Sequence, residues 1–415
     1  MAGPQAAGLN RCGWPRYFSF ARDADGIAAL DGLRAAAILL VLARHAVMPF
    51  RADGGMAFEV FGWQIATPLV NGWIGVDLFF VLSGFLISHS IIRRRDGFRL
   101  GRYVARRALR IVPAYYAMLG IAAAGAIPFY TVDPELLGLR ILYHALFLQD
   151  YLPSGIVVAF WSLGVEEKFY IAAPFVLLPL LRLHRRGAQY AILGALVLTP
   201  LAFRVNLLAG GAVVADYDAF FRSLRSPFHR GFDGLAAGAF VALLWRDRGR
   251  MAWMADPRAA AALFWAGAGA VSWLWLSAPL LDTIDAFDRI FLQLVLAAGF
   301  AALLLGLLLR RGRPGGAAGF FNAPVLRPVA VLSYSLYLVH MTVIPAAKLA
   351  ATGLVGPVST NSAAEFAVFV PVYLILSVLA ALILYSAVEK PFLHHGAPHR
   401  CRPGRRWFRT RRSPR

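Results

Sequence analysis

The chain of 415 residues is 59% hydrophobic and only 15% charged, and its mean hydropathy is +0.61. Because soluble domains have about 25% charged residues, this composition excludes an ordinary soluble protein and indicates an integral membrane protein. The formal net charge of +20 does not require a nucleic-acid partner, since basic residues beside membrane spans follow the positive-inside rule and meet anionic lipid headgroups.

Ten apolar stretches, each long enough to cross a membrane at about 20 residues per crossing, predict an all-α bundle of ten transmembrane helices. They fall near residues 27–50, 70–92, 109–131, 160–182, 189–209, 228–245, 258–280, 290–310, 325–347 and 364–388. We expect a transmembrane domain over 27–392, between a cytoplasmic N-terminal segment, 1–26, without a removable signal peptide, and a basic, disordered cytoplasmic tail, 393–415.

The loop charges predict how these helices are oriented. With the N-terminus inside, 31 of the 42 lysines and arginines lie in cytoplasmic segments, six lie in the opposite loops and five lie within spans. Since positive residues accumulate on the cytoplasmic side, both termini are predicted to be cytoplasmic.

Two ionisable residues of the first predicted span, Arg34 and His45, lie eleven positions apart. At about 100° per helical residue, eleven positions return nearly to the same face, roughly 16 Å further along the axis. Ionisable groups at membrane depth usually face a bundle interior or a watery cavity, so both are candidate functional residues. The alternative is an ion pair between Arg34 and Asp31 and a histidine satisfied in the core.

The second span carries Asp77 within GWIGVDLFFVLSG, where small residues allow another helix to approach closely. A carboxylate packed near His45 would orient the imidazole or raise its basicity, as acids do for general bases. Alternatively, Asp77 caps the start of the helix.

A basic cluster precedes the third span and includes Arg106, Arg107 and Arg110. Guanidinium groups bind phosphate oxygens in bidentate geometry, so the cluster fits a phosphorylated cytoplasmic ligand. The alternative is plain anchoring at the cytoplasmic surface.

The fourth span begins with an acidic pair, Glu166 and Glu167, which is costly in a membrane unless the carboxylates are hydrated or paired. We expect Lys168 to neutralise one of them. The ninth span places hydroxyl groups and a second imidazole in apolar surroundings. Further candidate site residues of these two spans are Trp161, Ser162, Tyr170, Tyr334, Tyr337 and His340.

Two other features bear on ligands and on the outer surface. The two cysteines, Cys12 and Cys401, lie near the ends of the chain without metal-site spacing, and we expect no bound metal or cofactor. The longest outer connection, 132–159, holds a short apolar run typical of an interfacial or re-entrant segment.

Six segments, taken in order, resemble the successive motifs of the acyltransferase-3 family of membrane O-acyltransferases. They are LDGLRAAAILLVLARHA, GVDLFFVLSGFLIS, RRALRIVPAYY, FWSLGVEEKFY, SYSLYLVH and EKPF. The resemblance implies a bacterial inner-membrane protein that moves an acyl group from cytoplasmic acyl-CoA to a hydroxyl of an envelope or extracellular glycan, or of a small molecule. It implies the stand-alone form, without the esterase-like domain that some relatives carry.

The resemblance also implies roles for particular residues. His45 corresponds to the family's essential histidine and Arg34 to its basic partner, while Arg107 and Arg110 correspond to an arginine pair near the acyl-CoA entrance. The acidic pair of the fourth motif is matched, but Lys168 follows it where the family usually has glutamine.

The leading interpretation is therefore transfer of a short acyl group, most simply acetyl, with neutral His45 removing the acceptor proton. Burial favours the neutral imidazole, and both direct transfer and an acyl-histidine relay remain open. Expected partners are acyl-CoA, a glycan or polysaccharide acceptor and anionic lipids. The alternatives are a transporter or flippase of a glycan or lipid intermediate and a non-catalytic membrane partner.

Overall fold

A computed structural model of the chain describes residues 27–51, 59–60, 63–64, 66–152, 155–277, 280, 284–310, 316–356 and 362–395. The predicted N-terminal segment, nearly all of the predicted tail and both cysteines lie outside the described residues. The regular structure of the described part is helical, apart from a two-residue antiparallel pair of β1 (Glu59–Val60) with β2 (Trp63–Gln64). The predicted all-α class is therefore confirmed.

The helices follow one another in three groups along the chain. The first group is α2 (Ala28–Arg51), α3 (Ala66–Val70), η1 (Asn71–Trp73), α4 (Ile74–Arg93), η2 (Arg95–Gly97), α5 (Leu100–Ala123), α6 (Leu137–Ala145), η3 (Val158–Phe160) and α7 (Trp161–Arg182). The second is α8 (Arg186–Ala209), α9 (Tyr217–Phe220), the π-helical turn η4 (Phe221–Arg225), α10 (Phe228–Gly231), α11 (Asp233–Asp247), η5 (Arg248–Arg250), η6 (Ala252–Ala255) and α12 (Pro257–Leu276). The third is α13 (Ala286–Ile290), α14 (Leu292–Leu309), α15 (Gly316–Phe321), α16 (Leu326–Val339), α17 (Ile344–Val355), α18 (Ala363–Leu384), the π-helical turn η8 (Tyr385–Glu389) and α19 (Lys390–His395).

Six helical segments of the described residues are long and apolar enough to cross a membrane, or seven if α16 and α17 form one broken span. Together with the composition, they make the chain an integral multi-pass membrane protein. The predicted third, fourth and sixth spans correspond to α5, α7 and α11. The first two carry more charged residues than a typical span, and α11 has only 15 residues.

Two predicted spans have different bounds in the structure. The predicted helix over 325–347 is wrong as one continuous element, because α16 and α17 meet at a bend of 88° and Pro345 in the first turn of α17 starts a new helix. The predicted third span, 109–131, is instead helical over α5, which ends just before Gly125 in the left-handed conformation (φ 64°). The arginine cluster is consequently part of this helix rather than of a loop.

Helix α4 is the central helix of the bundle and packs on α2, α7, α11 and α14. Close packing depends on glycine: a Cβ at Gly84 would lie 2.1 Å from the carbonyl oxygen of Leu235 in α11. The predicted close approach of another helix to the small residues of this span is confirmed.

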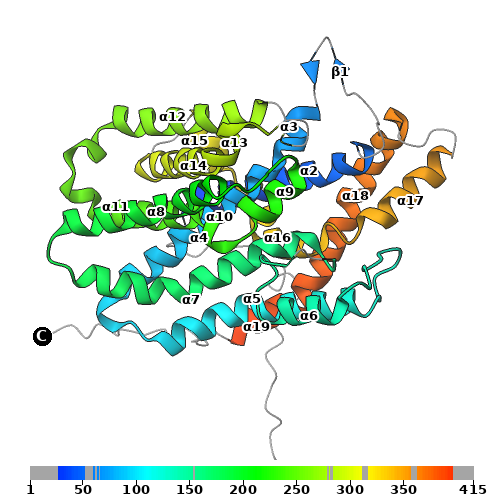
Figure 1. The fold of residues 1–415 in the computed structure, drawn as a ribbon, viewed down its shortest axis with the longest axis horizontal. Coiled ribbons are helices and arrows are strands. Elements are labelled where there is room, and N and C mark those ends of the chain that lie inside the picture. The colour runs from blue at the N-terminus through cyan, green and yellow to red at the C-terminus, as the bar shows by residue number, and fades with distance from the viewer. Residues whose placement is uncertain are drawn as a thin grey trace, which may run out of the picture.

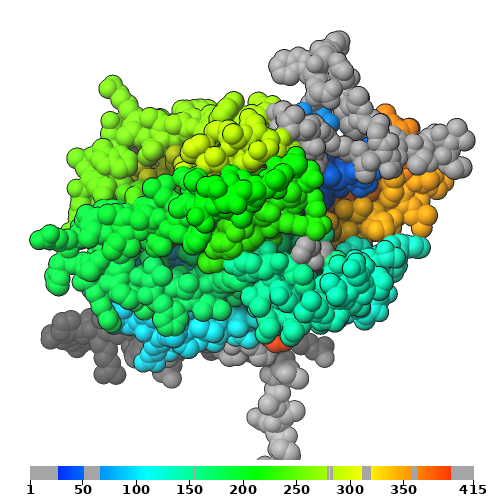
Figure 2. Space-filling view, in the orientation of Figure 1, coloured from blue at the N-terminus to red at the C-terminus, as the bar shows by residue number. Residues whose placement is uncertain are grey.

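The remaining helices are arranged around α4 (Figure 1). Helices α12 and α14 pair on one side, α17 and α18 pair on the opposite side, and α5 runs along one edge beside α6 and α19. Figure 2 shows α6 and its flanking loop on the surface near α17. Helix α6 exposes apolar side chains such as Leu142, at 51% exposure, in keeping with the interfacial segment predicted over 132–159.

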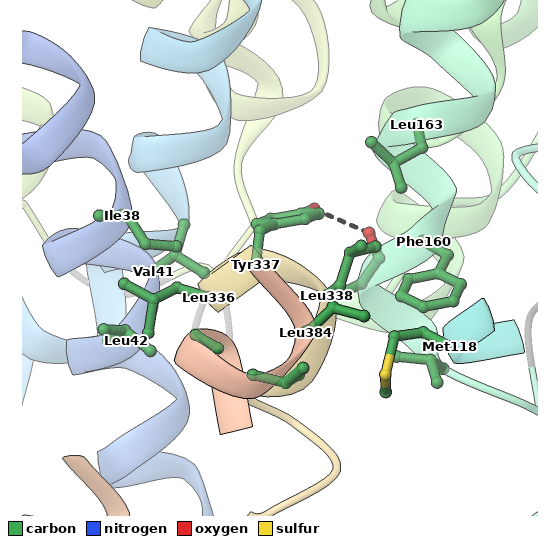
Figure 3. Close-up of a cluster of buried hydrophobic side chains, with 14 of the residues drawn as sticks. Ile38, Val41, Leu42, Met118, Phe160, Leu163, Leu336, Tyr337, Leu338 and Leu384 are labelled. Carbon is green, nitrogen blue, oxygen red and sulfur yellow. Dashed lines mark hydrogen bonds between the residues drawn. The ribbon is translucent and has the colours of Figure 1, made fainter. Parts of the chain in front are cut away.

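A hydrophobic cluster joins α2, α7 and α16, and Tyr337 lies in the middle of it (Figure 3). The ring of Tyr337 lies between Val41 of α2 on one side and Phe160 and Leu163 of the η3–α7 segment on the other. This packing fixes the position of α16 against the two helices that carry half of the candidate site residues.

Candidate active site

The candidate site consists of three adjoining cavities, of which the first is an arginine vestibule of about 820 Å³ between α2, α4, α5 and α19. No carboxylate of the described residues lines it. Its guanidinium groups are those of Arg34, Arg93, Arg94, Arg106, Arg107 and Arg110. Because guanidinium groups bind phosphate well, the vestibule is suited to a polyanionic ligand.

Two other buried charges of the bundle, those of Arg204 and Asp31, are paired. Arg204 of α8 and Asp233 of α11 form a fully buried bidentate pair, with two N···O distances of 2.9 Å. Asp31 pairs with Arg327 at 2.8 Å, so the alternative ion pair of Asp31 with Arg34 is wrong.

The arginines of the vestibule differ from these paired groups. Among the described residues, no carboxylate lies within ion-pair distance of Arg34, Arg106, Arg107 or Arg110. Ionisable groups at membrane depth usually pair with one another or line a pathway. Positively charged groups without a carboxylate partner therefore mark the vestibule as the place where an anionic ligand belongs.

The second, central cavity is narrow, at about 90 Å³, and shares Arg34, Arg107 and Arg110 with the vestibule. Glu166 lines it and accepts hydrogen bonds from the hydroxyl groups of Ser83, at 3.2 Å, and Tyr170. A cavity of this size excludes a nucleotide but admits a thin chain, so the two cavities together suit a ligand with a charged head and a slender arm.

Further predicted residues surround the central cavity. Tyr334 lines it and donates a hydrogen bond to the carbonyl oxygen of Ile111 at 2.8 Å. Glu167 is half-buried, and within the described part of the chain it has no ion-pair partner and lines none of the three cavities. The structure thus separates the two acids: Glu166 faces the cavity and Glu167 does not.

The third cavity, of about 380 Å³, contains His45 and shares Val76 and Tyr337 with the central cavity. His45 is half-buried, and its Nδ1 lies 2.9 Å from the carbonyl oxygen of Val41. A carbonyl oxygen only accepts, so Nδ1 is the protonated nitrogen and Nε2 keeps its lone pair. The ring therefore presents the nitrogen that a general base needs.

Two hydroxyl groups lie at the junction between the central cavity and the His45 cavity. Tyr337 donates to the carbonyl oxygen of Ala159 at 2.7 Å, and its hydroxyl lies 2.6 Å from Oγ of Ser162. Trp161 lines the His45 cavity on the same helix as Ser162. His340 packs against His45, with ring centroids 4.8 Å apart.

The structure corrects the expectation for Asp77. Its carboxylate does not contact His45 but binds Arg225, at 2.8 and 3.3 Å, and the N-terminal cap of α4 is Trp73 rather than Asp77. The guanidinium of Arg225 lies over the rings of Trp73 and Trp161, 4.4 and 5.4 Å from their centroids. Asp77 therefore positions an arginine that lines the His45 cavity.

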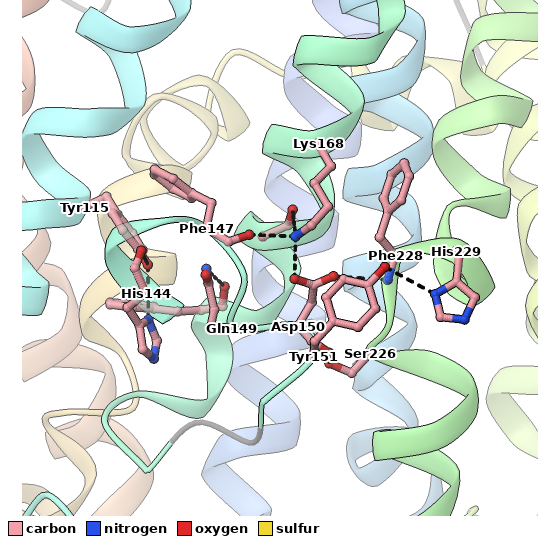
Figure 4. A network of polar contacts seen from close by, with 12 residues as sticks. Tyr115, His144, Phe147, Gln149, Asp150, Tyr151, Lys168, Ser226, Phe228 and His229 are labelled. Atoms are coloured by element: carbon pink, nitrogen blue, oxygen red, sulfur yellow. Dashed lines mark hydrogen bonds and ion pairs between the residues drawn. The ribbon is translucent and has the colours of Figure 1, made fainter. Parts of the chain in front are cut away.

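The structure also corrects the expectation for Lys168. Its ammonium group does not neutralise the acidic pair but binds Asp150, at 2.5 Å, and the carbonyl oxygen of Phe147, at 2.6 Å. Asp150 also accepts from the backbone N–H of Phe228 at 3.1 Å. Figure 4 shows Lys168 at the centre of this network, which joins α7, the outer connection and α10. Lys168 thus anchors a loop.

Sequence reasoning missed Arg225, which we counted among the outer loop residues. The one available signal was Asp77 itself, because a carboxylate inside a span requires a partner. As for metals, the described residues contain no cluster of three or more His, Cys, Asp or Glu side chains suited to hold an ion.

The fold and cavities define the class of protein first: a multi-pass helical membrane protein in which an arginine-lined vestibule adjoins, through a narrow cavity, the cavity of a half-buried histidine. A family model described as an acyltransferase domain matches residues 27–386. The chain therefore belongs to this acyltransferase family, as the six motifs led us to expect.

Three relatives illustrate the match. BcsY of Komagataeibacter xylinus, a predicted membrane-bound transacylase, is 30% identical over 75% of this chain and 71% of its own length. The exopolysaccharide production protein ExoZ of Rhizobium meliloti is 27% identical over 80% of this chain and 93% of its own length. The peptidoglycan O-acetyltransferase OatA of Listeria monocytogenes is 30% identical over 38% of this chain, but the match covers only 25% of OatA. No solved structure matches the chain significantly.

Proposed function

We propose that the chain transfers an acyl group, in the simplest case acetyl, from cytoplasmic acyl-CoA to a hydroxyl of an envelope or extracellular glycan. The observation that carries the proposal is the run of three adjoining cavities from the arginine vestibule to His45. Two relatives named for exopolysaccharide production and peptidoglycan O-acetylation support a glycan acceptor.

The donor occupies the vestibule and the central cavity. Arg107 and Arg110 hold the phosphate groups of CoA, with Arg106 at the rim, and Arg34 lies where the vestibule narrows. Arg34 and His45 are separated by about 16 Å along α2, so a group held at Arg34 reaches His45 only through an extended arm. Pantetheine is such an arm, and it places the thioester near Tyr337.

The chemical step takes place where the central cavity meets the His45 cavity. Nε2 of His45 accepts the proton of the acceptor hydroxyl while its oxygen forms a bond to the thioester carbon. Tyr337 at this junction gives its one proton to the carbonyl oxygen of Ala159, so the neighbouring hydroxyl of Ser162 is the group that turns its proton to the developing oxyanion. The carbon–sulfur bond then breaks, and the protonated His45 returns the proton to the CoA thiolate.

The membrane topology follows from the same arrangement. We propose ten spans with both termini cytoplasmic in the bacterial inner membrane, since the vestibule lies at the Arg93–Arg110 end of α4 and α5, where the loops are most basic. His45 lies near the other end of α2 and opens toward the acceptor side. Anionic lipids would meet the basic surface beside the vestibule.

The proposal is tested in a strain that lacks the gene and is complemented with the wild type, H45A or H184A. His184 is an exposed histidine far along the chain and serves as the matched control. Mass spectrometry of the envelope polysaccharide should show O-acyl groups restored by the wild type and H184A but not by H45A at equal membrane levels. Restoration of O-acyl groups by H45A would show that His45 is not the base. Export of the acceptor without acylation would favour the flippase alternative.

A further inference from the structure

His340 has a feature that the proposed reaction does not use. It lies at the bend between α16 and α17, its side chain is fully buried, and Nε2 has no hydrogen-bond partner. Buried polar atoms are nearly always paired, and an unpaired one carries a free-energy cost that calls for an explanation. Its neighbour in space is His45, with ring centroids 4.8 Å apart and an interplanar angle of 67°.

The two histidines are held in the same way. Nδ1 of His340 lies 2.8 Å from the carbonyl oxygen of Tyr337 and 3.2 Å from that of Leu336, and Nδ1 of His45 lies 2.9 Å from that of Val41. Both rings therefore carry their proton on Nδ1, turned back toward their own helix. Nε2 of His340 forms no hydrogen bond in this structure, although the two rings are in contact at a centroid distance of 4.8 Å.

Two nitrogen atoms that both lack a proton cannot form a hydrogen bond with each other. A hydrogen bond between the two Nε2 atoms therefore needs one additional proton. The proposed reaction supplies that proton when His45 deprotonates the acceptor hydroxyl. We propose that His340 is a positioning residue that completes the pair: its Nε2 accepts the N–H of the His45 imidazolium during acyl transfer. This inference rests on the proposed function and deepens it.

The step balances without any further reactant. The acceptor O–H bond breaks and an N–H bond forms on Nε2 of His45, while the acceptor oxygen bonds to the acyl carbon and the carbon–sulfur bond breaks. His340 holds the new N–H by hydrogen bonding and takes no covalent part. The proton then passes from His45 to the CoA thiolate, and the pair returns to its resting state. Arg44, the charged neighbour on α2, is bound to the carbonyl oxygen of Val70 and the hydroxyl of Tyr217 and offers no acceptor to His45.

The test compares H340F, which removes the acceptor atom and keeps a ring, with H340Q, whose amide oxygen can accept the N–H. His144 supplies a matched control, because it is equally buried, at 1% exposure, but lies outside the three cavities. The purified variants are assayed for CoA release from acetyl-CoA in detergent with oligosaccharides from the envelope polysaccharide as acceptors. Unfolding temperature is measured alongside.

We expect H340F to lower kcat at least about tenfold, with KM for both substrates unchanged, and H340Q to recover most of the loss. H144F should lower the unfolding temperature and leave kcat per folded enzyme unchanged. A purely structural role of His340 would instead lower the stability of H340F without a selective loss of kcat. If H340F does not accumulate, H340A tests the same loss of the acceptor atom.

Two further outcomes separate this inference from the proposed function. If H340F keeps the wild-type kcat while H45A is inactive, the proposed role of His340 is wrong and His45 remains the proposed base. Activity in H45A overturns the proposed base, and the pairing of the two histidines with it.

Discussion

Arg34 and Arg204 are two arginines with different expected roles. Arg34 is expected to bind the donor, whereas Arg204 stabilises the fold through an ion pair. Each lies on a long apolar helix, but Arg204 is bound to Asp233 while Arg34 has no carboxylate partner among the described residues. We predict that R204M lowers stability and that R34M lowers activity. Methionine removes the charge and keeps most of the length of the side chain.

The expected magnitudes follow from the contacts of each side chain. Arg204 and Asp233 are 1% and 2% exposed at their side chains, and Arg204 also donates to the carbonyl oxygen of Arg230 at 2.7 Å. Removing one partner of a buried pair costs about 3–5 kcal/mol. R34M breaks no ion pair, so the free energy of unfolding should fall far less than in R204M. Loss of a charge-assisted contact to the donor, worth about 1.5–3 kcal/mol, should raise its KM about tenfold or more.

The assay is unfolding in detergent micelles followed by tryptophan fluorescence, with acetyl-CoA turnover measured on the same preparations. The two variants should show opposite patterns: R204M should be unstable, whereas R34M should be stable and bind the donor weakly. If R34M is as unstable as R204M, or if it keeps the wild-type KM for acetyl-CoA, the reasoning from unpaired arginines is refuted.

Three further predictions follow from single contacts. R107Q should raise the KM for acetyl-CoA about tenfold with little change in kcat, because the phosphate contact is made equally before and during reaction; a change in kcat alone would contradict this role. K168M should lower the unfolding temperature and K168M/D150N should restore much of it, since the double variant leaves no buried charge unpaired; additive losses would show that the pair is not coupled. G84A should prevent accumulation in the membrane, because its Cβ would lie 2.1 Å from a backbone oxygen, whereas G101A, which meets no atom within 4 Å, should accumulate like wild type.

Much of the fold could be predicted from the sequence, because membrane spans are recognisable as long apolar stretches. The close approach at Gly84 was predictable, since small residues in a span indicate helix contact. The bend between α16 and α17 was not, because Pro345 lies in a stretch of uniform hydropathy and a proline there is compatible with either a kinked or a broken helix. The start of α5 was placed too late because its arginines lower the hydropathy of a helix that is nevertheless continuous.

The sequence predicted the features of the candidate site that lie within one helix. It did not predict the ion pairs between residues that are far apart in the chain. That Arg34 and His45 share a face of α2 follows from helical geometry alone. The partners of Asp77 and Lys168, namely Arg225 and Asp150, come from distant segments, so helical periodicity could not identify them. The contact between His45 and His340 is likewise set by the packing of α16 on α2.

In the proposed reaction, donor and acceptor approach His45 from opposite faces of the membrane through adjoining cavities. Inside-out membrane vesicles can test this arrangement, with the glycan sealed inside and acetyl-CoA supplied to the exposed cytoplasmic face. We expect the sealed glycan to be acetylated, and acetyl-CoA sealed inside with it to remain unused. Acetylation only when donor and glycan share one face would show that the two substrates do not reach His45 from opposite sides.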